Sequence, residues 1–376
     1  MKRLVLMGGG HAHVKVLAEL AAQPLPGWDV HLVSPYRRQI YSGMLPGWVA
    51  GHYAIDACAI ALDQLAARAA VAFHETAGTA LDLPQKSLLC ADGSTLRYDV
   101  LSIDTGPVAS LAHLPGAEAH ALPIRPIERF ISAWPAVVER MAGRCSPFHL
   151  VVLGGGAAGV ELVFAIRHRA NVEGWSHLFL TLVGSDEWPL PGAPTAMRTQ
   201  AAALLKARGI QWRGGHRATR LDEQHLHLDG AEDLVFDTCI VATGAAAPAW
   251  PAAAGLATDE QGFIQVGRTL QSRSHPNVFA AGDVAAHVDP RPKSGVYAVR
   301  AGPVLARHLR AYCEGQPVPS WTPQARALYL ISTGDRHALA TWGAWSWSGR
   351  WVWRWKDRID RRFMQRFGTV AQESTP

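Results

Sequence analysis

The sequence has few cysteines, and their spacing suggests no structural role. The five are odd in number, widely separated and form no CxxC pair; they are Cys58, Cys90, Cys145, Cys239 and Cys313. A disulfide framework or a zinc site is therefore not expected, and we predict no metal. A reducing, cytosolic compartment fits this cysteine content best.

Long apolar runs and a targeting segment are also lacking. No uninterrupted apolar stretch reaches the length that spans a bilayer. The N-terminal MKRLVLMGGG has a run of only four apolar residues before its glycines, too short for a signal peptide. We therefore expect a chain that neither crosses a membrane nor is exported.

An excess of basic over acidic charge is lacking outside one segment. The formal net charge is +5, and residues 350–366 alone hold seven basic and two acidic side chains, a difference of 7 − 2 = +5. The remainder is balanced, which argues against a nucleic-acid binder, whose basic residues would lie on the main domain. With 376 residues, 48% of them hydrophobic and 18% charged, the chain is long enough for two or three globular domains.

Glycine, in contrast, is concentrated in a turn near the start. In KRLVLMGGGHAHVKVLAEL a short apolar run is followed by three glycines and a helical pattern, and DVHLVS supplies the next strand. This order is typical of a βαβ unit, in which Gly8 allows the tight turn and Gly10 lets the backbone approach a pyrophosphate at the helix N-terminus. His13 replaces the third glycine of this motif, and Ser34 replaces the acidic residue that binds the ribose hydroxyls.

The same pattern returns, complete, in PFHLVVLGGGAAGVELVFAIRHR. Gly154, Gly156 and Gly159 form G-x-G-x-x-G between a strand and a helix. The position of the acidic residue holds Gly184, so the choice between NADH and NADPH stays open. A glycine-rich connection without a ligand is the alternative for either loop, but two such loops, 154 − 8 = 146 residues apart, favour nucleotide binding.

Three later segments continue the scheme. YDVLSIDTGPVA (98–109) and FDTCIVATGAAA (236–247) each place an apolar strand before Thr-Gly, once after each loop. HPNVFAAGDVAA (275–286) places a strand before Gly282 and Asp283. A carboxylate there can accept hydrogen bonds from a polyol chain, and the following amide can meet a phosphate. The simpler alternative makes Asp283 the cap of the next helix.

The order GGGHAH, DTG, GGGAAG, ATG and AAGD, over about residues 1–310, resembles the pyridine nucleotide–disulfide oxidoreductase superfamily of two-dinucleotide-binding-domain flavoproteins. The resemblance implies an α/β fold with two Rossmann-like domains, one for FAD and one for NADH or NADPH as co-substrate. We expect an FAD-binding domain in two parts, 1–115 and 245–315, around an NAD(P)H-binding domain, 116–244. A C-terminal β-hairpin and amphipathic helix would fill 316–376.

The resemblance also implies the binding residues. Those for FAD would be Gly8, Gly9, Gly10, His11, Ala12, His13, Ser34, Arg37, Ser42, Gly43, Met44, Gly78, Thr105, Gly106, Gly282, Asp283, Lys293 and Val296. Those for NAD(P)H would be Gly154, Gly156, Ala157, Gly159, Glu161 and Gly244. Glu161 matches a position near the nicotinamide and Lys293 one near the flavin. No side-chain nucleophile is required, because hydride passes between the two cofactors.

Disulfide reductases of this superfamily carry a CxxxxC pair beside the flavin, whereas this sequence has only Cys58 in that region. A thiol relay is therefore not expected. The most similar branch is the type II NADH:quinone oxidoreductases, and GGGHAHV, YSGMLPG and WRWKDRIDRRF resemble a subgroup also found fused to selenophosphate synthetase. The resemblance implies an FAD-dependent NAD(P)H dehydrogenase that reduces a quinone or another small acceptor. The alternatives are a soluble reductase of a protein or a sulfur- or selenium-linked acceptor, and a flavin-binding regulatory protein.

The C-terminal segment combines aromatic and basic residues. Residues 326–343 predict a hairpin about Gly334 and Asp335, and a helix is expected from about residue 350. In that helix an aromatic stripe recurs every four residues, at Trp351, Trp355, Ile359, Phe363 and Phe367. Such a stripe is typical of a core or a dimer interface, but the adjacent basic charge favours an anionic membrane surface. We expect a homodimer attached peripherally to the cytoplasmic face of the inner membrane.

Overall fold

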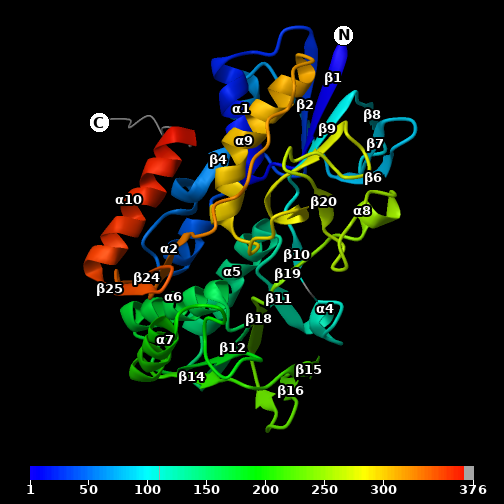
Figure 1. Ribbon diagram of the computed structural model, residues 1–376. Coiled ribbons are helices and arrows are strands. Elements are labelled where there is room, and N and C mark those ends of the chain that lie inside the picture. The colour runs from blue at the N-terminus through cyan, green and yellow to red at the C-terminus, as the bar shows by residue number, and fades with distance from the viewer. Residues whose placement is uncertain (110, 368–376) are drawn as a thin grey trace, which may run out of the picture.

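Two parallel five-stranded sheets, each covered by helices, form the body of the molecule (Figure 1). The computed structural model describes residues 1–109 and 111–367; the end of the expected C-terminal segment, 368–376, lies outside the described residues. Apolar strands buried on both faces are typical of such sheets. The predicted α/β fold with two dinucleotide-binding sheets is confirmed.

The first sheet has the strand order β21-β9-β1-β2-β5. Its strands are β1 (Lys2–Met7), β2 (Trp28–Ser34), β5 (Ala72–Glu75), β9 (Val100–Ile103) and β21 (Val278–Ala280). Helices α1 (His11–Ala22) and α9 (Gly295–Cys313) pack against each other beside it. Gly302 permits this close packing, since a Cβ there would lie 2.6 Å from the Lys15 Cβ.

Short elements surround this sheet. They are β3 (Arg38–Ile40), η1 (Ser42–Met44), α2 (Leu45–Val49), η2 (Ile55–Cys58), β4 (Ala59–Ala61), α3 (Leu62–Arg68), β6 (Gly78–Asp82), β7 (Ser87–Cys90), β8 (Thr95–Arg97), β10 (Val108–Ala109), β19 (Ala245–Ala246), α8 (Trp250–Ala253), β20 (Ile264–Val266), η3 (Gly282–Val284) and β22 (Ala285–His287). η1 and η3 lie on the side of the sheet where the strands end, and both adjoin the site described below.

The second sheet has the order β11-β18-β12-β13-β14. Its strands are β11 (Ala121–Pro123), β12 (Phe148–Leu153), β13 (Leu178–Val183), β14 (Ile210–Arg213) and β18 (Thr238–Val241). The helices around it are α5 (Ile127–Ala142), α6 (Ala157–Glu173) and α7 (Thr195–Ala207). Outlying elements are α4 (Ala117–His120), β15 (Ala218–Leu221), β16 (His225–Leu228) and β17 (Leu234–Val235).

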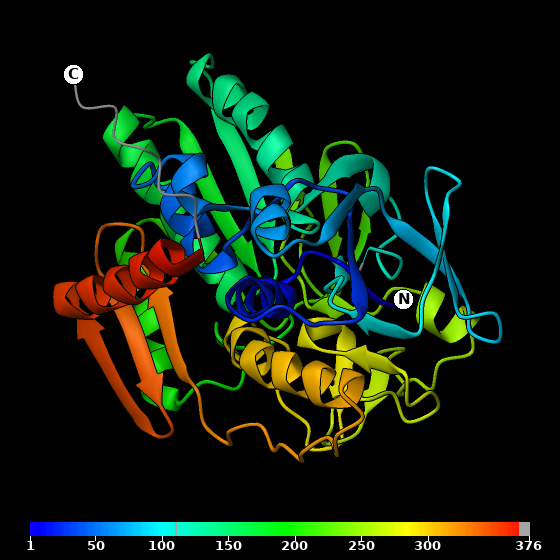
Figure 2. The same cartoon turned by 90° about the horizontal axis from the view of Figure 1, so that it is seen from above.

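The C-terminal part forms a small antiparallel sheet and a long helix. The predicted hairpin is present as β23 (Leu328–Ser332) and β24 (Ala338–Trp342), and a third strand, β25 (Trp345–Gly349), extends it. Figure 2 shows this sheet and α10 (Arg350–Phe367) together on one side of the molecule. Among the described residues, no helix combines the length and apolarity needed to cross a membrane.

Helix α10 divides the predicted aromatic stripe between solvent and core. Trp351, Trp355 and Ile359 are exposed, whereas Phe363 is half-buried and Phe367 is buried. A four-residue spacing advances about 40° around the axis at each step, so the stripe turns from solvent towards the protein. The stripe therefore presents its first residues to solvent and its last to the core.

The buried end of α10 packs on the first dinucleotide unit. The Phe363 ring stacks on Tyr41 with centroids 4.4 Å apart. The Lys15 ammonium of α1 lies 4.0 Å from the Phe367 ring centroid. The C-terminal helix is thus an integral part of the domain that contains the N-terminal glycine loop.

A buried ion pair anchors the middle of α10. Lys356 Nζ lies 2.8 Å from Asp360 Oδ2 and donates to the carbonyl oxygen of Gly43 at 2.5 Å. Burial alone would lower the pKa of Lys356, but the carboxylates of Asp360 and Glu161 keep this pKa raised. The helix is therefore joined by charge as well as by apolar packing to η1.

Replacing Asp360 by Ala should lower the free energy of unfolding by about 3 kcal/mol or more, because the Lys356 ammonium would lose its closest counter-charge while buried. The matched control is Arg354→Ala, an exposed side chain of the same helix, for which a change within about 0.5 kcal/mol is expected. Urea unfolding measures both. Equal losses in the two variants would contradict a buried pair at this position.

Candidate functional site

The two glycine loops have the same backbone geometry at their first glycine. Gly8 N donates to Val33 O, and Gly154 N donates to Val183 O, each at 2.8 Å. Both glycines have positive φ, +98° and +127°, and a Cβ at either would lie 2.5 Å from a carbonyl oxygen of the neighbouring strand's end. Any other residue would be strained and would clash, so both turns require glycine.

Each loop leads directly into the N-terminus of a helix. Val14 N donates to Gly10 O in α1, and Val160 N donates to Gly156 O in α6, at 3.1 and 3.0 Å. The amides of the first turn point out of the helix and favour an anion. A Cβ at Gly156 would meet nothing within 4 Å. The second loop therefore leaves room for a pyrophosphate to approach.

The third position of the motif differs between the loops. Gly159 is required in the second, because a Cβ there would lie 1.9 Å from Gly154 O. In the first, the buried ring of His13 takes this place, with Nδ1 2.6 Å from Gly8 O and Nε2 2.8 Å from Ser102 Oγ. Burial lowers the pKa of His13 to about 4, so the ring is neutral. Since protein atoms engage both ring nitrogens, the ring of His13 is not available to a cofactor.

Sequence analysis missed a carboxylate at the first loop. Asp104 follows β9, is 3% exposed, and its Oδ2 accepts from the amides of Ala12 and His13 at 2.7 and 3.0 Å. Burial raises the pKa of Asp104 to about 7. The available signal was the first letter of DTG, which is alanine in the matched ATG of the second unit.

Three other residues predicted for FAD have different surroundings. Ser34 is buried, and its Oγ lies 3.1 Å from where a Cβ of Gly9 would be. Arg37 is exposed and pairs with Glu75 at 2.7 Å. Gly78 packs against β1, since its Cβ would lie 2.6 Å from Met7 Cε. Ser34 therefore adjoins the loop, Arg37 lies at the surface, and Gly78 supports the sheet.

A cavity of about 740 Å³ is bordered by η3 and α9. Gly282, Asp283 and Lys293 line it, together with Tyr297 and Ala298. Burial raises the pKa of Asp283, whereas the cations of Arg125 and Lys293 lower it. Of the residues predicted for FAD, Gly282, Asp283 and Lys293 line this cavity. Thr105 and Gly106 follow Asp104, and the Thr105 hydroxyl donates to Gly106 O at 3.5 Å.

The flavin-side loop meets α9, α6 and α10. A Cβ at Gly295 would lie 3.4 Å from Ser42 Oγ, Met44 is buried, and Val296 is half-buried. Gly43 O accepts from Lys356, as described above.

Glu161 of α6 reaches the same junction. Its Oε1 accepts from Ser332 N of β23 at 2.8 Å. Burial raises the pKa of Glu161 to about 7, opposed by the charge of Lys356. The junction, defined here as Glu161, Lys356, Asp360, Tyr41 and Gly43, thus collects ionisable groups from both nucleotide units and the C-terminal helix. Sequence analysis missed Lys356 and Asp360 because their charges suggested an exposed face; their i,i+4 spacing was the only signal.

Some of the shielded polar atoms that lack a hydrogen-bond partner in the described structure lie at the two loops. His11 Nε2 and Ser294 Oγ are of this kind beside the first loop and the cavity, and Thr243 Oγ1 is so beside the second loop. Ala157 and Gly244 are exposed at the second loop. Buried polar atoms normally have partners. The glycine turns and these atoms fit a dinucleotide at each loop, with the Asp104 carboxylate already on the α1 amides at the first.

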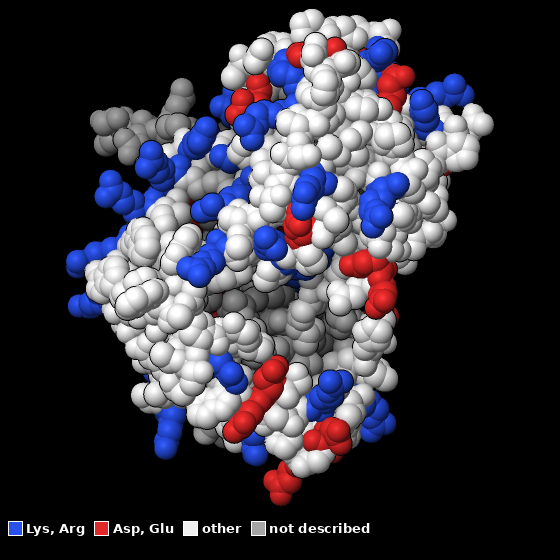
Figure 3. Space-filling view, in the orientation of Figure 1, with Lys and Arg blue, Asp and Glu red and all other residues white. Residues whose placement is uncertain are grey.

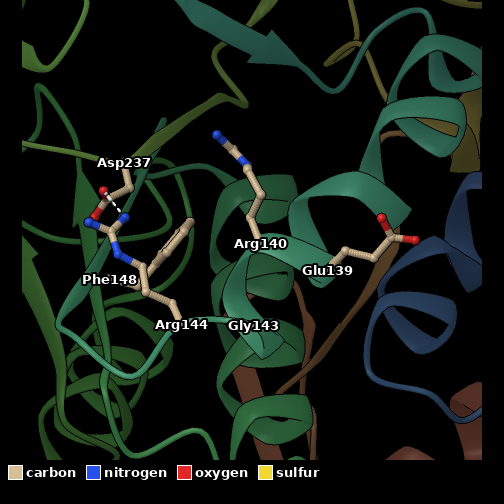
Figure 4. A pocket seen from close by; sticks show the side chains of 6 residues that line it. All are labelled: Glu139, Arg140, Gly143, Arg144, Phe148 and Asp237. Atoms are coloured by element: carbon tan, nitrogen blue, oxygen red, sulfur yellow. Dashed lines mark hydrogen bonds and ion pairs between the residues drawn. The ribbon is translucent and has the colours of Figure 1, made fainter.

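A smaller pocket of about 300 Å³ lies elsewhere (Figure 4). It is lined by Arg140 near the end of α5, Arg144 just beyond that helix, Phe148 at the start of β12, and Asp237, which pairs with Arg144. Because Phe148 and Gly154 lie at opposite ends of β12, this pocket is remote from the nucleotide loop. It belongs to neither predicted site.

Comparison with known proteins agrees with this geometry. The chain is 24% identical over 293 residues to demethylphylloquinone reductase NdbB of Synechocystis, covering 75% of this chain and 72% of that protein. It is 22% identical to NADH dehydrogenase-like protein YutJ of Bacillus subtilis, covering 90% and 91%. Ferroptosis suppressor protein 1 of Xenopus laevis and that of Xenopus tropicalis are each matched over only 51% of their length. NDH2 of Plasmodium falciparum in complex with NADH has the same fold, with a TM-score of 0.82 at 14% identity over 98% of this chain and 99% of that one.

The pyridine nucleotide-disulphide oxidoreductase model matches residues 2–302, which include both glycine loops, Asp283 and the start of α9. This family implies FAD and NAD(P)H as the ligands of the two loops. The protein is therefore an oxidoreductase of the pyridine nucleotide-disulphide oxidoreductase family.

Proposed function

We propose that the protein is an FAD-dependent NAD(P)H:quinone oxidoreductase that works without a redox-active disulfide. The single observation that carries the proposal is the junction at which Glu161, the flavin-side loop and Lys356 meet between the two nucleotide loops. NAD(P)H and one proton would reduce a quinone to the quinol and leave NAD(P)⁺. Bound FAD would supply the two-electron relay between them.

The protein's own groups would position the reactants and supply the proton. The reaction consumes one proton beyond the transferred hydride, and Glu161, with a pKa of about 7, can hold it near neutral pH. Its Oε1 is fixed by Ser332 N, which leaves Oε2 for the proton. Lys356 would add a positive charge beside Gly43, where negative charge develops on reduction.

The absence of a thiol relay is supported by the surroundings of Cys58. This residue is buried near Met44, with Sγ 4.0 Å from Met44 O. Burial raises the pKa of Cys58 to about 12, so the nucleophilic thiolate is scarce. All five cysteines are free in the structure.

The exposed side of the C-terminal part supports attachment to a membrane. Trp345, Trp351 and Trp355 are 71%, 52% and 38% exposed. Lysine and arginine side chains gather beside this apolar surface, over α10 (Figure 3). The exposed arginines of α10 are Arg350, Arg354, Arg358, Arg361, Arg362 and Arg366. Interfacial tryptophans and basic residues together suit an anionic lipid surface, on the cytoplasmic face of the inner membrane in our proposal.

A soluble reductase of a protein or sulfur- or selenium-linked acceptor is the second candidate. The same junction would serve this function if the acceptor approached it from solvent and not from a membrane. A flavin-binding regulatory protein is the third, and it is favoured by the departures at His13 and Asp104. A homodimer through the exposed tryptophans is the competing role for the C-terminal surface.

The purified protein should contain FAD, and NADH or NADPH added without oxygen should bleach the visible flavin bands. Quinone added afterwards should restore the flavin bands, because the reduced flavin would pass both electrons to the quinone. Visible spectroscopy follows both steps. Bleaching without recovery would favour a different acceptor, and a bound flavin that neither nucleotide bleaches would contradict the proposed activity.

A variant with all five cysteines changed to Ser or Ala should keep the rate of flavin reduction by NADH within about twofold of wild type, because no thiolate takes part. Stopped-flow absorbance measures the rate. The single variant Cys58→Ser, checked for flavin content, serves as control. Loss of reduction in that variant with flavin retained would point to a thiol relay.

The triple variant Trp345→Ser, Trp351→Ser, Trp355→Ser should bind vesicles containing phosphatidylglycerol at least about tenfold more weakly than wild type, because the apolar contact is lost. Vesicle sedimentation at low and high salt measures this, and salt should weaken the remaining binding. Phe179→Ser, an exposed aromatic on β13, is the matched control. If the wild-type protein does not bind the vesicles at low salt, membrane attachment is contradicted. If the triple variant loses a dimer that the wild type forms, the dimer role is favoured.

A further inference from the structure

The two nucleotide units differ at one matched position. In the first sheet Met7 of β1 pairs with Ile103 of β9, and in the second Leu153 of β12 pairs with Val241 of β18. The next residue on the second strand of each pair is Asp104 in the first unit and Ala242 in the second. The backbones agree here, since both residues present a carbonyl oxygen 2.5 Å from where a Cβ of the first glycine would be.

The side chain of Asp104 fills the space that the second unit leaves open. A Cβ at Gly10 would lie 2.3 Å from Asp104 Cγ, whereas a Cβ at the matched Gly156 would meet nothing within 4 Å. The Asp104 carboxylate also holds the amides of Ala12 and His13. Those amides belong to the first turn of α1, which is the anion-binding end of the helix. The first loop therefore already carries a carboxylate where a dinucleotide pyrophosphate would approach.

Among the described residues, no cation lowers the pKa of Asp104. Asp283 of η3 raises the pKa of Asp104 further by like-charge repulsion. On α1, burial keeps His11 and His13 neutral, with pKa values of about 4, and the Lys15 ammonium lies over the Phe367 ring. A pyrophosphate brought to this place would add two negative charges to two buried carboxyl groups.

The cations nearest this region act on the second carboxyl group. Arg125 and Lys293 lower the pKa of Asp283, and Lys293 donates to Ala285 O. Neither of them offsets a charge on Asp104. Neutralising Asp104 with a proton is the change that removes the conflict and leaves an O–H able to donate to a phosphate oxygen.

We infer that Asp104 is a proton-linked determinant of FAD binding: its carboxylate occupies the α1 amides in the free protein and takes up one proton when a dinucleotide pyrophosphate binds there. The inference rests on the proposed assignment of FAD to the first loop. Asp104 acts here as a positioning residue for the cofactor and not in hydride transfer.

The sign of the pH dependence follows from linkage. Bound pyrophosphate favours the protonated form, so the pKa of Asp104 is higher in the complex than in the free protein. FAD affinity is then constant below the free-protein pKa of about 7 and falls by about tenfold per pH unit above it, until the pKa of the complex is reached. The second loop, with Ala242 at the matched position, has no such group.

The test is the dissociation constant of FAD from the full-length protein, measured by the recovery of FAD fluorescence on dilution between about pH 6 and pH 9. Wild type should show the tenfold loss of affinity per unit above about pH 7. Asp104→Asn should show no slope, because its amide cannot titrate. Asp283→Asn is the matched control and should keep the slope.

Other outcomes overturn the inference. A slope unchanged in Asp104→Asn, or one lost only in Asp283→Asn, would assign the proton elsewhere. Should Asp104→Asn fail to fold, calorimetry of FAD rebinding to wild type in buffers of different ionisation enthalpy replaces it: uptake of up to one proton supports the inference, and no uptake refutes it. A protein that retains no FAD at any pH would instead refute the proposed function.

Discussion

The interaction on which the rest of the structure depends is the close approach of a glycine turn to the end of a parallel strand. Gly8 and Gly154 both place their backbone where a Cβ would collide with the neighbouring strand's terminal carbonyl. This contact aims the first turn of α1 and of α6 outward from the strand ends, so that helix amides face a ligand. Both loops have the same local geometry, and their differences come from the side chains added to it.

The C-terminal helix shows how a surface element can also build a site. One side of α10 presents Trp351 and Trp355 to solvent, and the other inserts Lys356 beneath Gly43. Both sides belong to one helix, so they are held rigidly relative to each other. Under the proposed function, a surface that attaches to lipid would therefore lie close to the groups that surround the flavin-side loop.

Sequence patterns predicted the architecture because its signals are local. Apolar runs before glycine turns gave the two sheets, and the boundary of α10 at Arg350 agrees with the aromatic periodicity. The role of Asp104 was not predictable in this way, since the β1–β9 pairing brings it to amides about ninety residues earlier in the chain. Burial of Lys356 and Asp360 was missed for the same reason: the groups that enclose them, Gly43 and Glu161, are distant in sequence.

The central claim is that FAD occupies the first loop and NAD(P)H the second, with their reactive ends meeting at the junction. A crystal structure of the protein with FAD and NADH bound, prepared without oxygen, tests it most directly. The account predicts the FAD pyrophosphate at the N-terminus of α1, the NADH pyrophosphate at that of α6, and the nicotinamide beside Glu161. A nucleotide bound with its nicotinamide remote from Glu161 and Lys356, or an α1 terminus without FAD, would contradict it.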